Sequence, residues 1–253
     1  MIDIHCHILP GIDDGAKHME ESISMAKRAV GNGIHTVMAT PRIQELTNSL
    51  QKEIEERVLL LNERLIQEKI QLGIIQGHIL SLDEKLVDTV SKGNLFSLGS
   101  AGGYLLVDLQ ENADPEQSNQ FIYNIQIHNN TPIISQVDKS TLLQNNPNFL
   151  YEFVKNGALA EVSAKSILGK NGKKLQKLTD ILIDANLVHF VSSGNKDSKE
   201  EIYLTEAYHA IGKRHGQDIT EELKENAQNV IKGKPVISRE PNRVKKKKIF
   251  GFI

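Results

Sequence analysis

The sequence predicts an α/β fold built on a parallel sheet. Seven short apolar runs alternate with stretches in which apolar residues recur at helical spacing. Most of the intervening segments are long enough for the crossovers that parallel strands require. A closed barrel and an open doubly wound sheet both satisfy this pattern, and 253 residues suit one domain of either kind.

The apolar runs are the expected strands, and turn residues bound several of them; Pro41, for example, stops the second. They cover residues 1–9, 34–40, 72–79, 104–109, 131–137, 158–163 and 187–193. Helices are expected where apolar residues share one face, as Ile54, Val58, Leu61 and Leu65 do. These stretches are about 19–30, 50–69, 115–128, 147–155 and 173–185, and the remainder of the chain up to about 232.

Composition excludes several classes of protein. A formal net charge of -2 argues against nucleic acid as the main partner, and no Gly-x-Gly-x-x-Gly turn follows a strand to support a dinucleotide site. Cys6 is the single cysteine, so an intramolecular disulfide is impossible. No signal peptide is recognised, and no run of about 18 uncharged apolar residues is present. A cytoplasmic protein is therefore expected.

The first expected strand ends in His5-Cys6-His7. Residues i and i+2 of a strand share a face, so both imidazoles are expected to point to one spot, as in a metal site, while Cys6 faces the core. The alternative is a pair of buried histidines satisfied by hydrogen bonds. Ligands of parallel α/β folds gather at the carboxyl ends of the strands, which makes those ends the candidate site.

The opening MIDIHCHILPGIDDGA resembles that of the bacterial PHP-type (polymerase-and-histidinol-phosphatase) protein-tyrosine phosphatases, the manganese-dependent enzymes of capsule and exopolysaccharide loci. The resemblance runs essentially end to end, through GIHTVMATP, LVDL, TPIIS, NGALAEVSAKSILGKNGKKL, ANLVHFVSS, LKENAQNVI and KKKKIFGFI.

This resemblance implies a distorted (βα)₇ TIM-like barrel in one domain, residues 1–235, followed by a basic tail, residues 236–253. It also implies a cluster of manganese or other divalent ions at the strand ends, which activates water to attack phosphotyrosine. The substrates implied are the tyrosine-rich tails of partner kinases in the exopolysaccharide system.

Most metal-ligand positions of the family are substituted in this chain. His5 and His7 match its amino-terminal histidines, and Asp108 takes the place of a bridging glutamate. Where the family reads Thr-Pro-His, this chain reads Thr-Pro-Arg. Five of eight ligand positions are lost, and they hold Arg42, Ile79, Gln136, Gly194 and Lys196. Positive side chains where ions would lie oppose metal binding.

Two interpretations of the remaining residues stay open. His5, His7 and Asp108 form a residual ligand set for one weakly bound divalent ion or none. Alternatively, three basic residues convert the site into one that holds phosphate without cleaving it; they are Arg42, Lys139 and Lys196. The same three residues can instead be ordinary solvated charges at the barrel rim. No catalytic residue is assigned.

Other polar residues near the strand ends are weaker candidates. His78 is expected to face the opposite side of its strand. Asp13 and Asp14 are typical turn formers, and Asp138 and Asp197 lie in loops. In the tail, residues 245–248 are four lysines. One interpretation is that they contact an acidic kinase tail or anionic lipid, and lipid contact would place the protein near the membrane. The alternative is that they belong to a disordered soluble end.

The function favoured by this pattern is a catalytically degenerate phosphatase homologue, a pseudoenzyme that binds or regulates the exopolysaccharide-system kinase through its phosphotyrosine tail. The alternative is an active metal-dependent protein-tyrosine phosphatase with a reduced or rearranged metal site.

Overall fold

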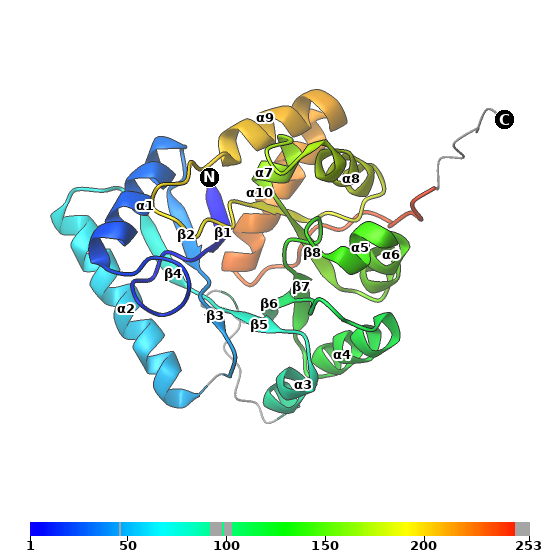
Figure 1. The fold of residues 1–253 in the computed structure, drawn as a ribbon, viewed down its shortest axis with the longest axis horizontal. Coiled ribbons are helices and arrows are strands. Elements are labelled where there is room, and N and C mark those ends of the chain that lie inside the picture. The colour runs from blue at the N-terminus through cyan, green and yellow to red at the C-terminus, as the bar shows by residue number, and fades with distance from the viewer. Residues whose placement is uncertain (46, 92–97, 99–102, 246–253) are drawn as a thin grey trace.

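Parallel strands form a curled sheet at the centre of the molecule, and helices cover its outside (Figure 1). The structure is a computed structural model that describes residues 1–45, 47–91, 98 and 103–245. Every pairing between strands in this part of the chain is parallel, as the alternation of apolar and amphipathic segments predicted.

The strands follow one another around a distorted barrel. They are β1 (Ile2–Cys6), β2 (Thr36–Ala39), β3 (Arg42–Ile43), β4 (Gly73–Gln76), β5 (Ile79–Ser81), β6 (Tyr104–Asp108), β7 (Thr131–Ile134), β8 (Leu159–Ser163) and β9 (Phe190–Ser192). The second predicted strand is β2, and the short strand β3 that follows Pro41 was not predicted. The third predicted strand is interrupted, so that β4 passes into β5. Sheet order is β1-β2-β4 and β3-β5-β6-β7-β8-β9, and a bridge from Cys6 to Asn195 brings the end of β9 back to β1.

The helices form the outer layer. They are α1 (Met19–Gly31), α2 (Asn48–Gln67), α3 (Glu84–Ser91), α4 (Pro115–Ile127), α5 (Thr141–Asn145), α6 (Asn148–Lys155), α7 (Ala164–Ile167), α8 (Lys173–Asp184), α9 (Leu204–His215) and α10 (Gln217–Ile231). The short helices α3, α5 and α7 were not predicted. The last predicted helical region is two helices, because Gly216 adopts φ 107°, which ends α9.

An apolar layer fills the barrel interior on the amino-terminal side of the polar residues at the strand ends. Ile79, Leu106, Ile133 and Leu159 oppose one another in register across β5, β6, β7 and β8. All four are buried in a cluster that also contains Ile4, Met38 and Phe190. Two residues further along their strands come Ser81, Asp108, Ser135, Glu161 and Ser192. The barrel interior therefore changes from apolar to polar toward the carboxyl ends of its strands.

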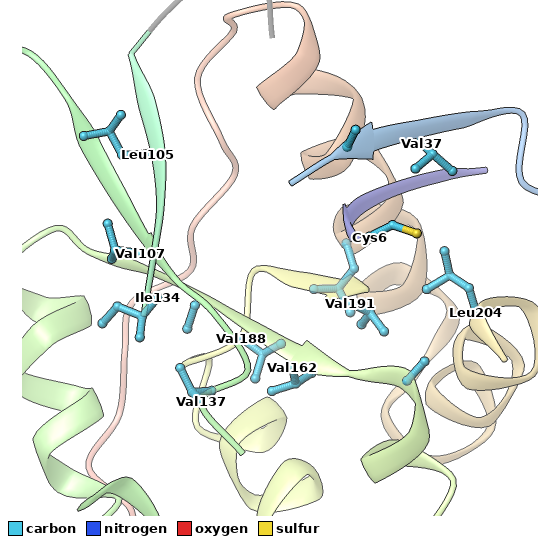
Figure 2. Close-up of a cluster of buried hydrophobic side chains, with 14 of the residues drawn as sticks. Cys6, Val37, Leu105, Val107, Ile134, Val137, Val162, Val188, Val191 and Leu204 are labelled. Atoms are coloured by element: carbon cyan, nitrogen blue, oxygen red, sulfur yellow. The ribbon is translucent and has the colours of Figure 1, made fainter. Parts of the chain in front are cut away.

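The opposite face of each strand packs against the helices. Outward residues of the sheet form a second apolar cluster with helix residues such as Ile54, Leu61 and Phe153. Figure 2 shows part of this cluster, including Cys6, Val37, Val107, Ile134, Val162 and Val191. Cys6 is 1% exposed within it, as expected for a core residue rather than a ligand.

The chain leaves α10 as an extended segment that crosses the barrel and ends at Lys245 in the described structure. Side-chain amides of Asn226 and Asn148 hydrogen-bond to the backbone of Ile237 and Val244. Most of the predicted lysine run and the apolar end of the tail, residues 246–253, lie outside the described residues. Among the helices described, none is long and apolar enough to cross a membrane.

Candidate functional site

A β-bulge in β1 places the two histidines of the opening motif inside the barrel. Asp3 pairs with Val37 and Cys6 with Ala39, so three steps along β1 match two along β2. The extra residue lets Ile4 lie in the apolar layer while His5 and His7 line the polar layer above it. Both histidines are 1% exposed.

The two imidazoles meet edge to edge, as the sequence predicted. Nε2 of His5 lies 3.2 Å from Nε2 of His7. Nδ1 of His5 lies 2.9 Å from Oε2 of Glu161, and Nδ1 of His7 lies 2.5 Å from Oδ2 of Asp13. A carboxylate accepts and does not donate, so each Nδ1 carries the proton. In the neutral rings both Nε2 atoms then present lone pairs to each other, and no hydrogen bond joins them.

Glu161 was not among the predicted site residues. It is fully buried on β8, and its second oxygen accepts a hydrogen bond from the hydroxyl of Ser192. The one available signal was a carboxylate inside the otherwise apolar run ALAEVS, because a buried charge needs a partner. That partner, His5, lies 156 positions away in the chain.

Asp13 orients His7 from the turn that follows β1. Its Oδ1 accepts the backbone N–H of Gly15, and its Oδ2 accepts the backbone N–H of Arg42 in addition to the imidazole. Burial alone would raise the pKa of Asp13, but these hydrogen bonds, the one from His7 first, lower it below the ordinary value. Asp13 is thus a structural turn former that also fixes a site histidine.

Arg42 and Asp108 form an ion pair across the polar layer. The guanidinium contacts Oδ2 of Asp108, and the hydroxyl of Ser135 donates to Oδ1 of the same carboxylate. The side chain of Arg42 is 44% exposed and that of Asp108 18%. The predicted metal ligand Asp108 and the predicted anion-binding residue Arg42 are therefore partners of each other.

The other two basic residues lie on loops at the same end of the barrel. Nζ of Lys196 lies 2.8 Å from Oδ2 of Asp14, and this hydrogen bond is the main reason that the pKa of Asp14 is lowered. Lys139 is exposed and forms no ion pair with the described residues. The structure thus brings Arg42 and Lys196 to the rim as charges that acidic side chains already neutralise.

The remaining substituted positions, 79, 136 and 194, offer no strong metal ligand. Ile79 is fully buried in the apolar layer. Gln136 adopts φ 41° and directs its amide toward Gly194, where a Cβ atom would overlap Nε2 of Gln136. His78 is buried, and burial lowers its pKa to about 4.

Two loop carboxylates, Asp138 and Asp197, are engaged locally. Oδ1 of Asp138 accepts the backbone N–H of Ser163, while its buried Oδ2 has no hydrogen-bond partner among the described residues. Burial raises the pKa of Asp138. Oδ1 of Asp197 accepts the backbone N–H of Lys199. Neither carboxylate contacts His5 or His7 through a described hydrogen bond.

The donor set fits one divalent ion and does not fit a multi-metal centre. Two nitrogen ligands of one ion, each about 2.1 Å from it and near a tetrahedral angle, lie about 3.4 Å apart. The two Nε2 atoms are 3.2 Å apart, and carboxylates orient both rings as they do in many metal sites. In contrast, Asp108 is paired with Arg42, and positions 79, 136, 194 and 196 offer no strong ligand.

A second acidic group, His7 with Asp13 and Asp14, also has ligand atoms within 4.8 Å of one another. Its carboxylates are already used, because Asp13 holds His7 and Asp14 holds Lys196. This group is better explained as the support of His7 than as an ion site.

Comparison with known proteins gives one consistent family. A family model described as "Capsular polysaccharide synthesis, CpsB/CapC" matches residues 1–232. The tyrosine-protein phosphatase YwqE of Bacillus subtilis (strain 168) is 34% identical over the whole of both chains. The putative tyrosine-protein phosphatase CapC of Staphylococcus aureus is 30% identical over 76% of each chain, and the tyrosine-protein phosphatase CpsB of Streptococcus pneumoniae is 26% identical over 88% of this chain and 94% of its own.

Solved structures agree with this result. A crystal structure from work on YwqE of Bacillus subtilis and CpsB of Streptococcus pneumoniae, described as unique metal-dependent tyrosine phosphatases, has a TM-score of 0.89 and 32% identity, covering 97% of this chain and 100% of its own. A histidinol phosphate phosphatase from Lactococcus lactis shares the fold alone, with a TM-score of 0.52 and 12% identity over 92% of each chain. The predicted resemblance and the predicted barrel are both confirmed.

Proposed function

Since the chain belongs to the capsular polysaccharide synthesis family CpsB/CapC, we propose that it binds tyrosine-phosphorylated protein without hydrolysing the phosphate ester. Its relatives are named tyrosine-protein phosphatases, which makes phosphotyrosine the natural ligand for a barrel of this family. In this proposed role the barrel keeps phosphotyrosine recognition and loses the metal-assisted reaction, because strong ligands are missing at five of the family's metal positions.

The observation that carries the proposal is the ion pair between Arg42 and Asp108. A hydrolytic centre with two or more ions uses carboxylates to offset the charge of the metals. Here the carboxylate on β6 is offset by a guanidinium, which is permanently charged and cannot act as a ligand. Lys196 adds a second positive charge at the same rim.

The same arginine supplies a means of holding a phosphate. A guanidinium presents parallel N–H donors that match two oxygens of a phosphoryl group, and 44% of the Arg42 side chain is open to solvent. Lys139, exposed on the loop after β7, and Lys196 add charge nearby. A phosphate dianion would then share or replace the carboxylates that now neutralise these cations.

The partner we propose is the phosphotyrosine tail of a tyrosine kinase of the exopolysaccharide system, as the family resemblance implies. The location proposed is the cytoplasm, near the membrane if the basic tail touches anionic lipid. Lys245, the last residue described, is exposed, in keeping with such a role.

Metal content, turnover and peptide binding together test the proposal. The purified chain is expected to carry less than about one metal ion per molecule and to release no phosphate from an aryl phosphate with added Mn²⁺, while YwqE assayed in parallel turns over. A phosphotyrosine peptide should bind, and Arg42→Ala should weaken binding at least about tenfold, since a charge-assisted bidentate contact contributes about 1.5–3 kcal/mol.

Arg64→Ala is the matched control, because Arg64 is 48% exposed and forms its ion pair with Glu68 on the outside of α2. Turnover comparable to that of YwqE, abolished by His5→Ala or His7→Ala, would contradict the proposal. Peptide binding that is unchanged by Arg42→Ala would contradict its binding half.

A second function, a phosphatase with a single-metal site, is supported by the geometry of the two histidines. His5 and His7 would hold the ion through Nε2, while Glu161 and Asp13 fix their rings. A divalent ion held there would supply Lewis-acid activation of a phosphoryl oxygen or of water. This activity predicts turnover that rises with Mn²⁺ and disappears in either histidine variant.

A further inference from the structure

Four carboxylates face the carboxyl end of the barrel, and the chain itself satisfies each of them. Asp13 accepts from His7, and Glu161 accepts from His5. Asp14 is paired with Lys196 and Asp108 with Arg42. Such a group of acidic side chains normally requires cations, because carboxylates near one another repel.

We infer that Arg42 and Lys196 are built-in counter-cations, which take over the charge-neutralising role of metal ions at this rim and exclude divalent ions from Asp108 and Asp14. The inference rests on the proposed loss of the multi-metal centre. It differs from the proposed function because it concerns the cations that neutralise the carboxylates at the rim, not the ligand that the rim binds.

Arg42 is placed for this role by two independent contacts. Its backbone N–H donates to Oδ2 of Asp13 at 2.8 Å, which ties β3 to the turn after β1. Its guanidinium reaches Asp108 on β6, whose other oxygen accepts from Ser135 on β7. An ion approaching Asp108 would be repelled by this guanidinium, and each oxygen of the carboxylate already has a partner.

Lys196 plays the same part on the other side of the rim. It follows Asn195, whose backbone is fixed to β1 through the bridge to Cys6 and through its carbonyl, which accepts the N–H of His7 at 2.9 Å. From this anchored position Nζ of Lys196 reaches Asp14, next to the carboxylate that orients His7. An ion at Asp14 would meet the ammonium group directly.

Gln136 and Gly194, two of the substituted ligand positions, lie against each other. The amide of Gln136 fills the volume that a side chain at position 194 would need, because a Cβ atom built on Gly194 would overlap Nε2 of Gln136. A carboxylate introduced at position 194 would therefore first have to displace this amide. The substitutions at positions 136 and 194 are sterically matched.

The test is a titration of Mn²⁺ alone into the full chain by calorimetry, with Arg42→Gln, Lys196→Gln and the control Arg64→Gln. Glutamine removes the charge and adds no strong ligand, so a gain in affinity reports exclusion rather than a new donor. We expect Arg42→Gln to bind Mn²⁺ at least about tenfold more tightly than the unaltered chain, and Lys196→Gln to show a smaller gain. Arg64→Gln should behave as the unaltered chain does.

Melting temperatures supply a second readout that does not depend on turnover or on peptide binding. Arg42→Gln should melt lower than the unaltered chain in chelator, and excess Mn²⁺ should raise its melting temperature by more than it raises that of the unaltered chain. If Arg42→Gln does not fold, Lys196→Gln, which alters a pair exposed by 37% and 61%, decides the question.

Equal Mn²⁺ affinity in the unaltered chain and in both rim variants would overturn the inference, and so would a Mn²⁺-dependent rise in melting temperature that is no larger in the variants than in the unaltered chain. These results differ from failure of the proposed function, which shows as phosphatase turnover or as absent peptide binding.

Discussion

At the residue scale, the contacts of Glu161 explain how this barrel stabilises a buried carboxylate. A fully buried carboxylate is costly unless it is paired and hydrogen-bonded. Glu161 meets both conditions, because His5 donates to one oxygen and Ser192 to the other. The same contact leaves Nε2 of His5 as an acceptor that faces His7.

Glu161→Gln should therefore loosen His5 more than it disturbs the fold. Glutamine has the same shape but can donate as well as accept, so it no longer specifies which ring nitrogen of His5 carries the proton. We expect a loss of about 1–3 kcal/mol in the free energy of unfolding. In ¹⁵N spectra of the imidazoles, the His5 signals should move toward a mixture of tautomers.

His189 is the internal control for that experiment. Its Nδ1 accepts the backbone N–H of Ala160, which fixes the other tautomer independently of Glu161. An unchanged His5 spectrum in the Glu161→Gln variant would show that Glu161 does not set the tautomer.

At the scale of elements, asparagine side chains on two helices hydrogen-bond to the backbone of the segment after α10. The extended segment after α10 lacks a neighbouring strand for much of its length, yet its backbone groups need partners. Asn226 of α10 supplies both, since it donates to the carbonyl of Ile237 at 2.9 Å and accepts its N–H at 2.8 Å. Asn148 of α6 does the same for Val244 at 3.2 and 2.9 Å.

Asn226→Ala should release this segment from the barrel. The variant removes both hydrogen bonds to the backbone of Ile237, a residue that is 38% exposed, so we expect a loss of about 1–3 kcal/mol in the free energy of unfolding and faster proteolysis near residue 237. Asn148→Ala, at a half-buried position, should cost less and expose the chain nearer to Val244. Equal proteolysis rates in both variants and in the unaltered chain would contradict this role for the asparagines.

Local pattern was sufficient to predict most elements, and tertiary pairing explains the others. The amphipathic periods of α1 and α2 are visible in the sequence, as are their ends. The stop at Pro41 was predicted, but the short strand β3 after it and the break at Gly77-His78 were not, because they depend on which neighbour each segment pairs with. The short helices α5 and α7 span too few turns for a periodic signal.

Closure of the barrel limits what the sequence reveals at the scale of the whole molecule. The strand ends that carry His5, Arg42, Asp108 and Lys196 were predicted to form one site, and the structure brings them to one rim. The pairings within that rim were not predictable. Arg42 with Asp108 and His5 with Glu161 each join residues that are distant in sequence, and only the curvature of the sheet decides which charges meet.

Two buried histidines are expected to lose their stabilising contribution to the whole molecule as the pH falls below about 6.5. His78 and His189 are buried away from solvent, and burial lowers the pKa of each to about 4, whereas an unfolded chain titrates its histidines near 6.5. Between these two values each of the two histidines is protonated in the unfolded state and neutral in the folded state, so its contribution to the free energy of unfolding falls as the pH is lowered through this range. The buried carboxyl group of Asp3, whose pKa is raised to about 6, acts in the opposite sense. Each histidine contributes on the order of 3 kcal/mol at most to that loss.

His189→Asn isolates one of these two contributions. The amide oxygen of asparagine can still accept the N–H of Ala160, and only the contact from Nε2 to Ser238 is lost. Denaturant unfolding from pH 7.5 to pH 4.5 should therefore show that the variant is somewhat less stable at the upper limit and loses less stability on the way down. The stability difference between the two proteins narrows or reverses as protons are added, because the variant has no imidazole to protonate at position 189. A difference that stays constant over this range would mean that His189 does not titrate with unfolding.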